Sequence, residues 1–143
     1  MELGLHDKVV IVTGGSKGIG EAITRSFLAE GADVVNVNRS TQAGEAMQAE
    51  YREKGQQCLF VQGDLTHGDA CQNAVQRTLD AFGRIDVLVN NAGVNDGVTL
   101  DAGPEEFTKS LQRNLIHYYS MLHFSLDALK ATNGVVVNIG SKV

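Results

Sequence analysis

The sequence has only two cysteines, fewer basic than acidic residues and no long hydrophobic run. Each of these features argues against a class of protein. Its 12 Lys and Arg residues are outnumbered by 17 Asp and Glu, so the net charge is -5 and we expect no nucleic-acid partner. No apolar stretch approaches a membrane span, and residues 1–8 lack the apolar core of a signal peptide. Cys58 and Cys71 lack Cys-x-x-Cys spacing. We therefore expect reduced thiols in a cytoplasmic protein.

Apolar, strand-like runs alternate with helical patterns along the chain. Strands are expected at 9–12, 33–38, 58–62, 85–89 and 135–139. Helices are expected between them: one ended by Gly31, then 41–54, 69–82, and a region opened by Pro104 that continues, with a break, through Ala131. This alternation predicts an α/β fold in a single domain, a doubly wound parallel sheet with helices on both faces.

A glycine-rich turn joins the first strand to the first helix. Glycines let the backbone turn sharply and approach a phosphate closely, and a helix start offers unpaired N–H groups and the positive end of the helix dipole. The turn therefore predicts a phosphate site for a dinucleotide, as in Rossmann-like folds with strand order 3-2-1-4-5. The expected binding residues here are Gly14, Ser16, Lys17, Gly18, Ile19 and Gly20.

Two other glycine motifs were weighed for the same turn. Gly14-x-Ser16-x-Gly18 matches the nucleophile elbow of serine hydrolases, but an elbow normally follows several strands, and this one follows the first. None of the four histidines has a local context that marks it as a base, so we disfavour this alternative. The ATPase phosphate loop is excluded, because no Gly-Lys-Ser/Thr follows at the required spacing.

The end of the second strand bears on the choice between NAD and NADP. An acid here would bind the ribose hydroxyls of NAD and repel the extra phosphate of NADP, but the chain has Asn38. Arg39 and Ser40 follow, and Lys17 adds a second cation nearby. Ordinary solvated surface cations are the alternative interpretation. We expect NADP, with NAD as the less favoured cofactor.

Four features in order resemble the short-chain dehydrogenase/reductase family. They are the Thr13-Gly14-x-x-x-Gly18-x-Gly20 turn, Asn90-Asn91-Ala92-Gly93 after the fourth strand, Asn114 in an otherwise apolar helix, and Ser141 after the fifth strand. The resemblance covers nearly the whole chain. It implies an NAD(P)-dependent oxidoreductase in which Asn114 orders a water and Ser141 hydrogen-bonds the substrate oxygen. It also implies that Asp64 and Leu65 contact the adenine, and that Asn90, Asn91, Ala92 and Gly93 lie against the cofactor.

The second half resembles the L-fucose dehydrogenases of that family. The resemblance rests on stretches such as Asn114-Leu115-Ile116-His117-Tyr118-Tyr119 and Val137-Asn138-Ile139-Gly140-Ser141-Lys142. Asn95, Asp96 and Lys142 would suit a polyhydroxylated substrate, although ordinary loop polarity explains them equally well. We expect no metal site. His117 and His123 are expected on the helix surface or in a subunit contact of a homo-oligomer.

The family's proton-transferring pair, a Tyr with a Lys four residues later, is absent from these 143 residues. Tyr51 is followed at that spacing by Gly55, Tyr118 by Leu122 and Tyr119 by His123. We therefore expect residues 1–143 to be a dinucleotide-binding domain that is incomplete at its C-terminus. The alternative is a non-catalytic module that only binds the dinucleotide.

Overall fold

The computed structural model describes residues 2–141 and contains one five-stranded parallel sheet. Its strand order is β3-β2-β1-β4-β5, which confirms the predicted topology. The strands are β1 (Val9–Thr13), β2 (Asp33–Asn38), β3 (Cys58–Gln62), β4 (Val87–Asn90) and β5 (Val135–Asn138). Their boundaries lie within two residues of the predicted ones, the usual uncertainty at the end of an element.

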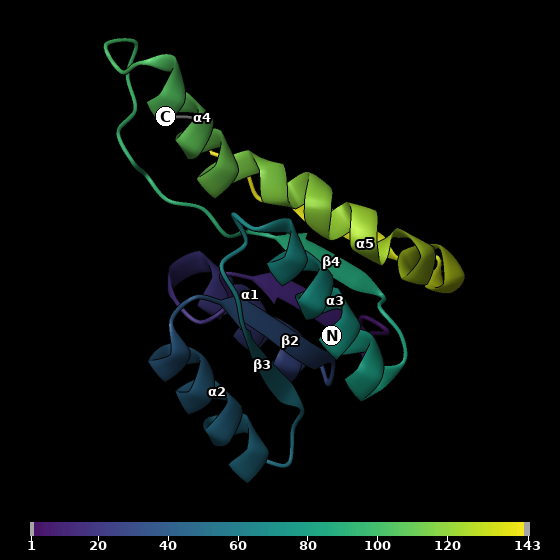
Figure 1. The fold of residues 1–143 in the computed structure, drawn as a ribbon. Coiled ribbons are helices and arrows are strands. Elements are labelled where there is room, and N and C mark those ends of the chain that lie inside the picture. Colours follow the sequence, from purple (N-terminus) through teal and green to yellow (C-terminus); the bar gives the residue numbers. More distant parts are fainter. Residues whose placement is uncertain (1, 142–143) are drawn as a thin grey trace.

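Helices cover both faces of this sheet (Figure 1). Side chains of α1 (Gly18–Ala29) and α2 (Thr41–Glu53) belong to one core cluster, with Leu28 and Met47 packed against Val10 and Val34. Side chains of α3 (Gly68–Phe82) and α5 (His117–Thr132) belong to the other, around Ile11, Leu88 and Met121. Both faces of β1 are therefore buried, as its continuous apolar sequence predicts.

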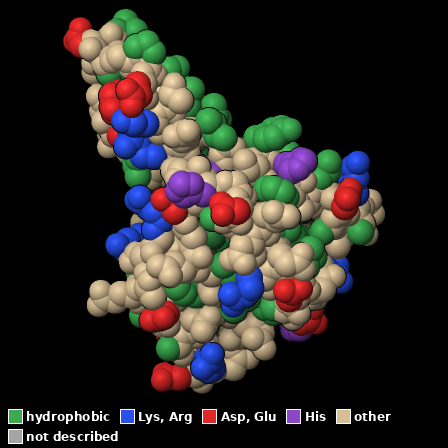
Figure 2. Space-filling model, in the orientation of Figure 1, with side chains coloured by type: hydrophobic (Ala, Val, Ile, Leu, Met, Phe, Trp, Pro, Cys, Tyr) green, Lys and Arg blue, Asp and Glu red, His purple; other side chains and the backbone are tan. Residues whose placement is uncertain are grey.

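The helix α4 (Pro104–Leu111) projects beyond the sheet and joins α5 through η1 (Gln112–Ile116), a π-helical turn (Figure 1). This turn is the break that the sequence predicted near Asn114. Hydrophobic side chains gather along α4 and α5 in Figure 2. Exposed members of this surface, here the α4–α5 apolar face, are Leu100, Phe107, Leu115, Ile116, Tyr119 and Leu126. Within residues 2–141, no helix has the length and apolar character needed to cross a membrane.

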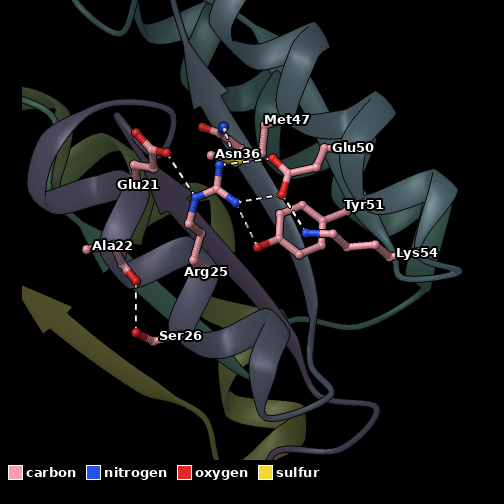
Figure 3. A network of polar contacts seen from close by, with 9 residues as sticks. All are labelled: Glu21, Ala22, Arg25, Ser26, Asn36, Met47, Glu50, Tyr51 and Lys54. Carbon is pink, nitrogen blue, oxygen red and sulfur yellow. Dashed lines mark hydrogen bonds and ion pairs between the residues drawn. The ribbon is translucent and has the colours of Figure 1, made fainter.

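An ion-pair network joins α1 to α2 on the molecular surface (Figure 3). Arg25 contacts Glu21 one turn earlier on α1 and both carboxylate oxygens of Glu50 on α2, at 2.8–3.0 Å. Its guanidinium also donates to the Tyr51 hydroxyl, and Lys54 pairs with Glu50. Arg25 and Lys54 hold the pKa of the Glu50 carboxyl down at about 2.

The strand β5 forms one edge of the sheet and is poorly covered. Val135 and Val137 are 55% and 39% exposed, although their sequence is as apolar as that of β1. Proteins usually cover a hydrophobic sheet edge of this kind.

Candidate functional site

The glycine turn between β1 and α1 is held in a shape that leaves its helix start open. Gly14 has a φ of +65°, and a Cβ there would lie 3.1 Å from the Ala92 Cα. A Cβ on Gly20 would collide with the Gly14 carbonyl. Within the described part of the chain, no side chain caps α1 at Lys17. The N–H groups of its first turn are thus available to an anion.

The Asn-Asn-Ala-Gly segment after β4 fixes this turn from the neighbouring strand. The N–H groups of Asn91 and Ala92 donate to the Thr13 hydroxyl at 2.9 and 3.0 Å. The Asn91 side chain donates to the carbonyls of Thr13 and Gly14. Asn90 differs, because its amide lies between strands and donates to the Asn138 side chain at 3.0 Å. Thr13 was not predicted as part of the site.

The two cations that bear on cofactor choice are Lys17, in the glycine turn, and Arg39, after β2. The Asn38 side-chain oxygen accepts the Ser16 N–H at 3.3 Å, while its buried Nδ2 has no partner among the described residues. Lys17 and Arg39 are both exposed, and neither forms an ion pair within residues 2–141. These two positive charges are therefore free to contact an anionic group of a ligand.

Asp64, after β3, is shaped by a tight local turn. Its Oδ1 accepts hydrogen bonds from the Thr66 N–H at 3.0 Å and the Thr66 hydroxyl at 2.7 Å. These bonds hold the pKa of the Asp64 carboxyl below its usual range, so the carboxylate is ionised at neutral pH. Asp64 is thus an acceptor at the β3 edge of the sheet, two strands away from the glycine turn.

A groove of about 490 Å³ runs along the carboxyl ends of β1 to β4 and brings most of these residues together. From the predicted set it is lined by Gly14, Ser16, Lys17, Ile19, Gly20, Asn38, Arg39, Ser40, Asp64, Leu65, Asn91, Ala92 and Gly93. Gly18 and Asn90 do not line it. The lining residues that were not predicted are Val37, Gly63, Thr66, Val94, Arg113 and His117. Most of these residues adjoin predicted residues in the sequence. A prediction that included every residue at each strand end would therefore have found them.

His117 was expected on the helix surface or in a subunit contact, but it lies buried inside the fold, so this expectation was wrong. It is 1% exposed and continues the buried stripe of α5 formed by Met121, Ser125 and Leu129. The four-residue spacing of that stripe was the signal in the sequence that could have shown that His117 is buried. His123 is exposed, and no cluster of three or more His, Cys, Asp or Glu suited to a metal occurs among residues 2–141.

Asn114 lies in the π-helical turn and holds the loop after β4. Its Oδ1 accepts the Val94 N–H at 2.7 Å, and its Nδ2 donates to the Ser110 carbonyl at 3.1 Å. Its side chain is therefore engaged with protein groups next to the groove rather than lining it.

The other predicted catalytic and substrate residues lie outside the groove lining. Ser141 is exposed beyond the end of β5, and Asn95 is exposed in the loop after β4. The Asp96 carboxylate is engaged by Arg113, at 3.0 Å, and by the Ser110 hydroxyl, at 3.1 Å. Lys142 lies outside the described residues.

The residues present fit a dinucleotide better than they fit a nucleophilic serine. Ser16 is 7% exposed, and no histidine lies within hydrogen-bond distance of it in the described chain. By contrast, a Cβ on Gly18 would meet nothing within 4 Å, which leaves space beside the helix start. The buried, unpartnered polar atoms of Asn38 and His117 also belong to residues that line the groove.

Comparisons with known proteins agree with this arrangement. A family model described as short chain dehydrogenase matches residues 8–143. The chain is 37% identical over 138 residues to an L-fucose dehydrogenase of Mus musculus, covering 95% of this chain and 49% of that protein. It is 34% identical over 143 residues to the 15-hydroxyprostaglandin dehydrogenase (NAD(+)) of Homo sapiens, covering 96% of this chain and 51% of that protein.

A solved structure is also similar in fold and sequence. A metagenomic short-chain oxidoreductase in complex with NADP superposes with a TM-score of 0.88 and 37% identity, covering 97% of this chain and 64% of that one. The chain spans about half the length of the curated relatives it matches. The family model, the parallel sheet and the groove together show that the chain belongs to the short chain dehydrogenase family.

Proposed function

We propose that this groove binds NADP and that the enzyme moves a hydride between NADP and a hydroxyl of a sugar such as L-fucose, or of a related secondary alcohol. The observation that carries the cofactor choice is the pair Lys17 and Arg39, with Asn38 where an acid would favour NAD. The similar metagenomic oxidoreductase was solved with NADP. The human relative is named for NAD(+), so family membership alone does not select the cofactor.

The proposed roles divide between holding the cofactor and holding the substrate. Bound NADP supplies the hydride chemistry at its nicotinamide ring. The first turn of α1 and the glycine turn hold its phosphates, while Thr13 and Asn91 keep that turn in shape. Ser141 would donate a hydrogen bond to the substrate oxygen, and Asn114 would order a water. These last two roles rest on the family resemblance.

The substrate class is proposed from similarity and loop chemistry. The mouse relative is an L-fucose dehydrogenase. Asn95 is exposed next to the groove wall at Val94 and could bind sugar hydroxyls. Asp96 would contribute only by exchanging its present contacts with Arg113 and Ser110.

Proton transfer needs a group that these 143 residues do not supply in the family's arrangement. The proposal therefore places the Tyr and Lys outside them, and the alternative remains a non-catalytic dinucleotide-binding module. The unpaired thiols of Cys58 and Cys71 support a reducing compartment such as the cytoplasm. We also propose that the α4–α5 apolar face packs on a second copy of the protein, which sedimentation of the complete enzyme tests.

The Ser141→Ala substitution in the complete enzyme tests the catalytic part of the proposal. Loss of one hydrogen bond to the reacting oxygen should lower kcat by about 10²–10³-fold, with NADP affinity nearly unchanged. Turnover of a sugar panel that includes L-fucose identifies the substrate. If Ser141 instead only stabilises the end of β5, the variant will have a lower melting temperature and an unchanged kcat. A stable, fully active variant would remove Ser141 from the mechanism.

A further inference from the structure

His117 lies in the groove wall with one ring nitrogen unpaired. Its side chain is 1% exposed, and its Nε2 lies 2.8 Å from the Arg113 carbonyl oxygen. Its Nδ1 is buried and has no hydrogen-bond partner among the described residues. Because buried polar atoms in native proteins are nearly always paired, this atom points to a partner supplied by a ligand.

The hydrogen-bond partner of Nε2 determines whether Nδ1 is a donor or an acceptor. A carbonyl oxygen can only accept a hydrogen bond, so Nε2 carries the proton and Nδ1 presents a lone pair. Burial also lowers the pKa of His117, which keeps the ring neutral at pH 7. The groove wall therefore contains a fixed acceptor, and its complement is a hydrogen-bond donor on the ligand.

Asp64 adds a second acceptor at the same end of the groove. It lines the groove with His117, and its charge acts on the His117 ring. Its Oδ1 is occupied by Thr66, whereas its Oδ2 has no hydrogen bond within residues 2–141. A carboxylate repels phosphate, so this end suits an uncharged group with more than one N–H, such as an amine on a heterocyclic base.

The cations that follow β1 and β2, the strands next to β3, indicate which base this is. In the proposed NADP complex, Lys17 and Arg39 face the phosphate on the adenosine ribose. The base attached to that ribose would then lie one strand further along the sheet, and the end of β3 with Asp64 is the next strand end. The amine at Asp64 and His117 is then the exocyclic amine of adenine.

We propose that the Nδ1 of His117 accepts a hydrogen bond from this amine and makes the groove select a 6-aminopurine over a 6-oxopurine. The inference rests on the proposed function, because it requires the dinucleotide to bind in this groove. His117 acts in it as a specificity residue of the cofactor site, remote from the reacting atoms.

The test compares NADPH with its deaminated analogue, in which hypoxanthine replaces adenine and a carbonyl replaces the amine. Dissociation constants are measured by nicotinamide fluorescence for the wild type, His117→Leu, His117→Asn and the control His123→Leu, on the exposed side of the same helix. Circular dichroism and melting temperature verify that each variant folds. Binding is read directly, so the result does not depend on turnover.

We expect the wild type to favour NADPH over the deaminated form, and His117→Leu to reduce this preference by about 3- to 10-fold, the scale of one hydrogen bond between neutral groups. His117→Asn places an amide oxygen near the position of Nδ1 and should restore much of the preference, while His123→Leu should leave it unchanged. If the folded Leu and Asn variants both keep the wild-type ratio, the inference is overturned while the proposed function stands. If the wild type binds neither dinucleotide, both the inference and the proposed function fail.

Discussion

At the scale of single residues, the proposed preference for NADP rests on the charge near the ends of β1 and β2. Asn38 uses its oxygen to hold the Ser16 N–H, so it supports the glycine turn without adding a negative charge. Lys17 and Arg39 stay exposed on either side of the same groove. A ligand phosphate would give both cations a partner, whereas a bare ribose hydroxyl would not.

The Arg39→Ala substitution tests this charge. It should weaken NADPH binding by about 1.5–3 kcal/mol, the range for a hydrogen bond to a charged group, because in the proposed complex the guanidinium contacts the extra phosphate. NADH has no such phosphate, so its affinity should barely change. Titration of both dinucleotides against variant and wild type measures the difference. An equal loss of affinity for NADPH and NADH would show that Arg39 does not contact the extra phosphate.

The two cysteines are predicted to be unreactive in the folded protein. Burial raises the pKa of Cys58 and of Cys71 to about 11, so at pH 8 only about one thiol in a thousand is ionised. We expect a disulfide reagent to label neither thiol of the folded chain on the minute scale, and both after unfolding in guanidinium. Rapid labelling of the folded chain would contradict the burial of these residues.

At the scale of elements, the site is an assembly of strand ends, and this is why the sequence predicted so much of it. The buried β-branched run of β1, the glycine turn and the alternation of elements suffice to place Gly14, Asn38, Asp64 and Asn91 along one edge of the sheet. His117 was missed because it comes from a helix. Its place in the groove depends on the rotation of α5 after the π-helical turn, which local sequence patterns describe poorly.

The network between α1 and α2 gives an element-scale prediction. The Arg25→Met substitution should lower the melting temperature at pH 7 by about 1–4 °C, a small effect because solvent screens these half-exposed groups. Arg77→Met is the matched control, because Arg77 is exposed on α3 and forms no ion pair within residues 2–141.

Acid should remove the stability that the ion pair between Arg25 and Glu50 contributes. The pKa of Glu50 in the folded protein, about 2, lies below its usual 4.5, so this stability is present above pH 4.5 and is lost as the pH falls toward 2. The difference between Arg25→Met and wild type should therefore shrink between pH 5 and pH 2.5, and also in 0.5 M salt. A difference that is constant over this range would assign the effect of Arg25 to packing.

At the scale of the whole molecule, the groove and two uncovered apolar surfaces lie on different parts of the fold. The groove follows the carboxyl ends of β1 to β4, whereas the α4–α5 apolar face and the β5 edge present Tyr119, Leu126 and Val135 to solvent. The sequence did not predict the extent of the α4–α5 apolar face, because α4 buries none of its own residues and its position follows from tertiary contacts.

Titration of the chain with NADPH and with NADH, followed by nicotinamide fluorescence, tests the central claim most directly. The account predicts saturable binding of NADPH with a Kd about tenfold or more below that of NADH, since one additional charge-assisted contact is worth at least about 1.4 kcal/mol. Equal affinity for the two dinucleotides, or no saturable binding of either, would contradict it.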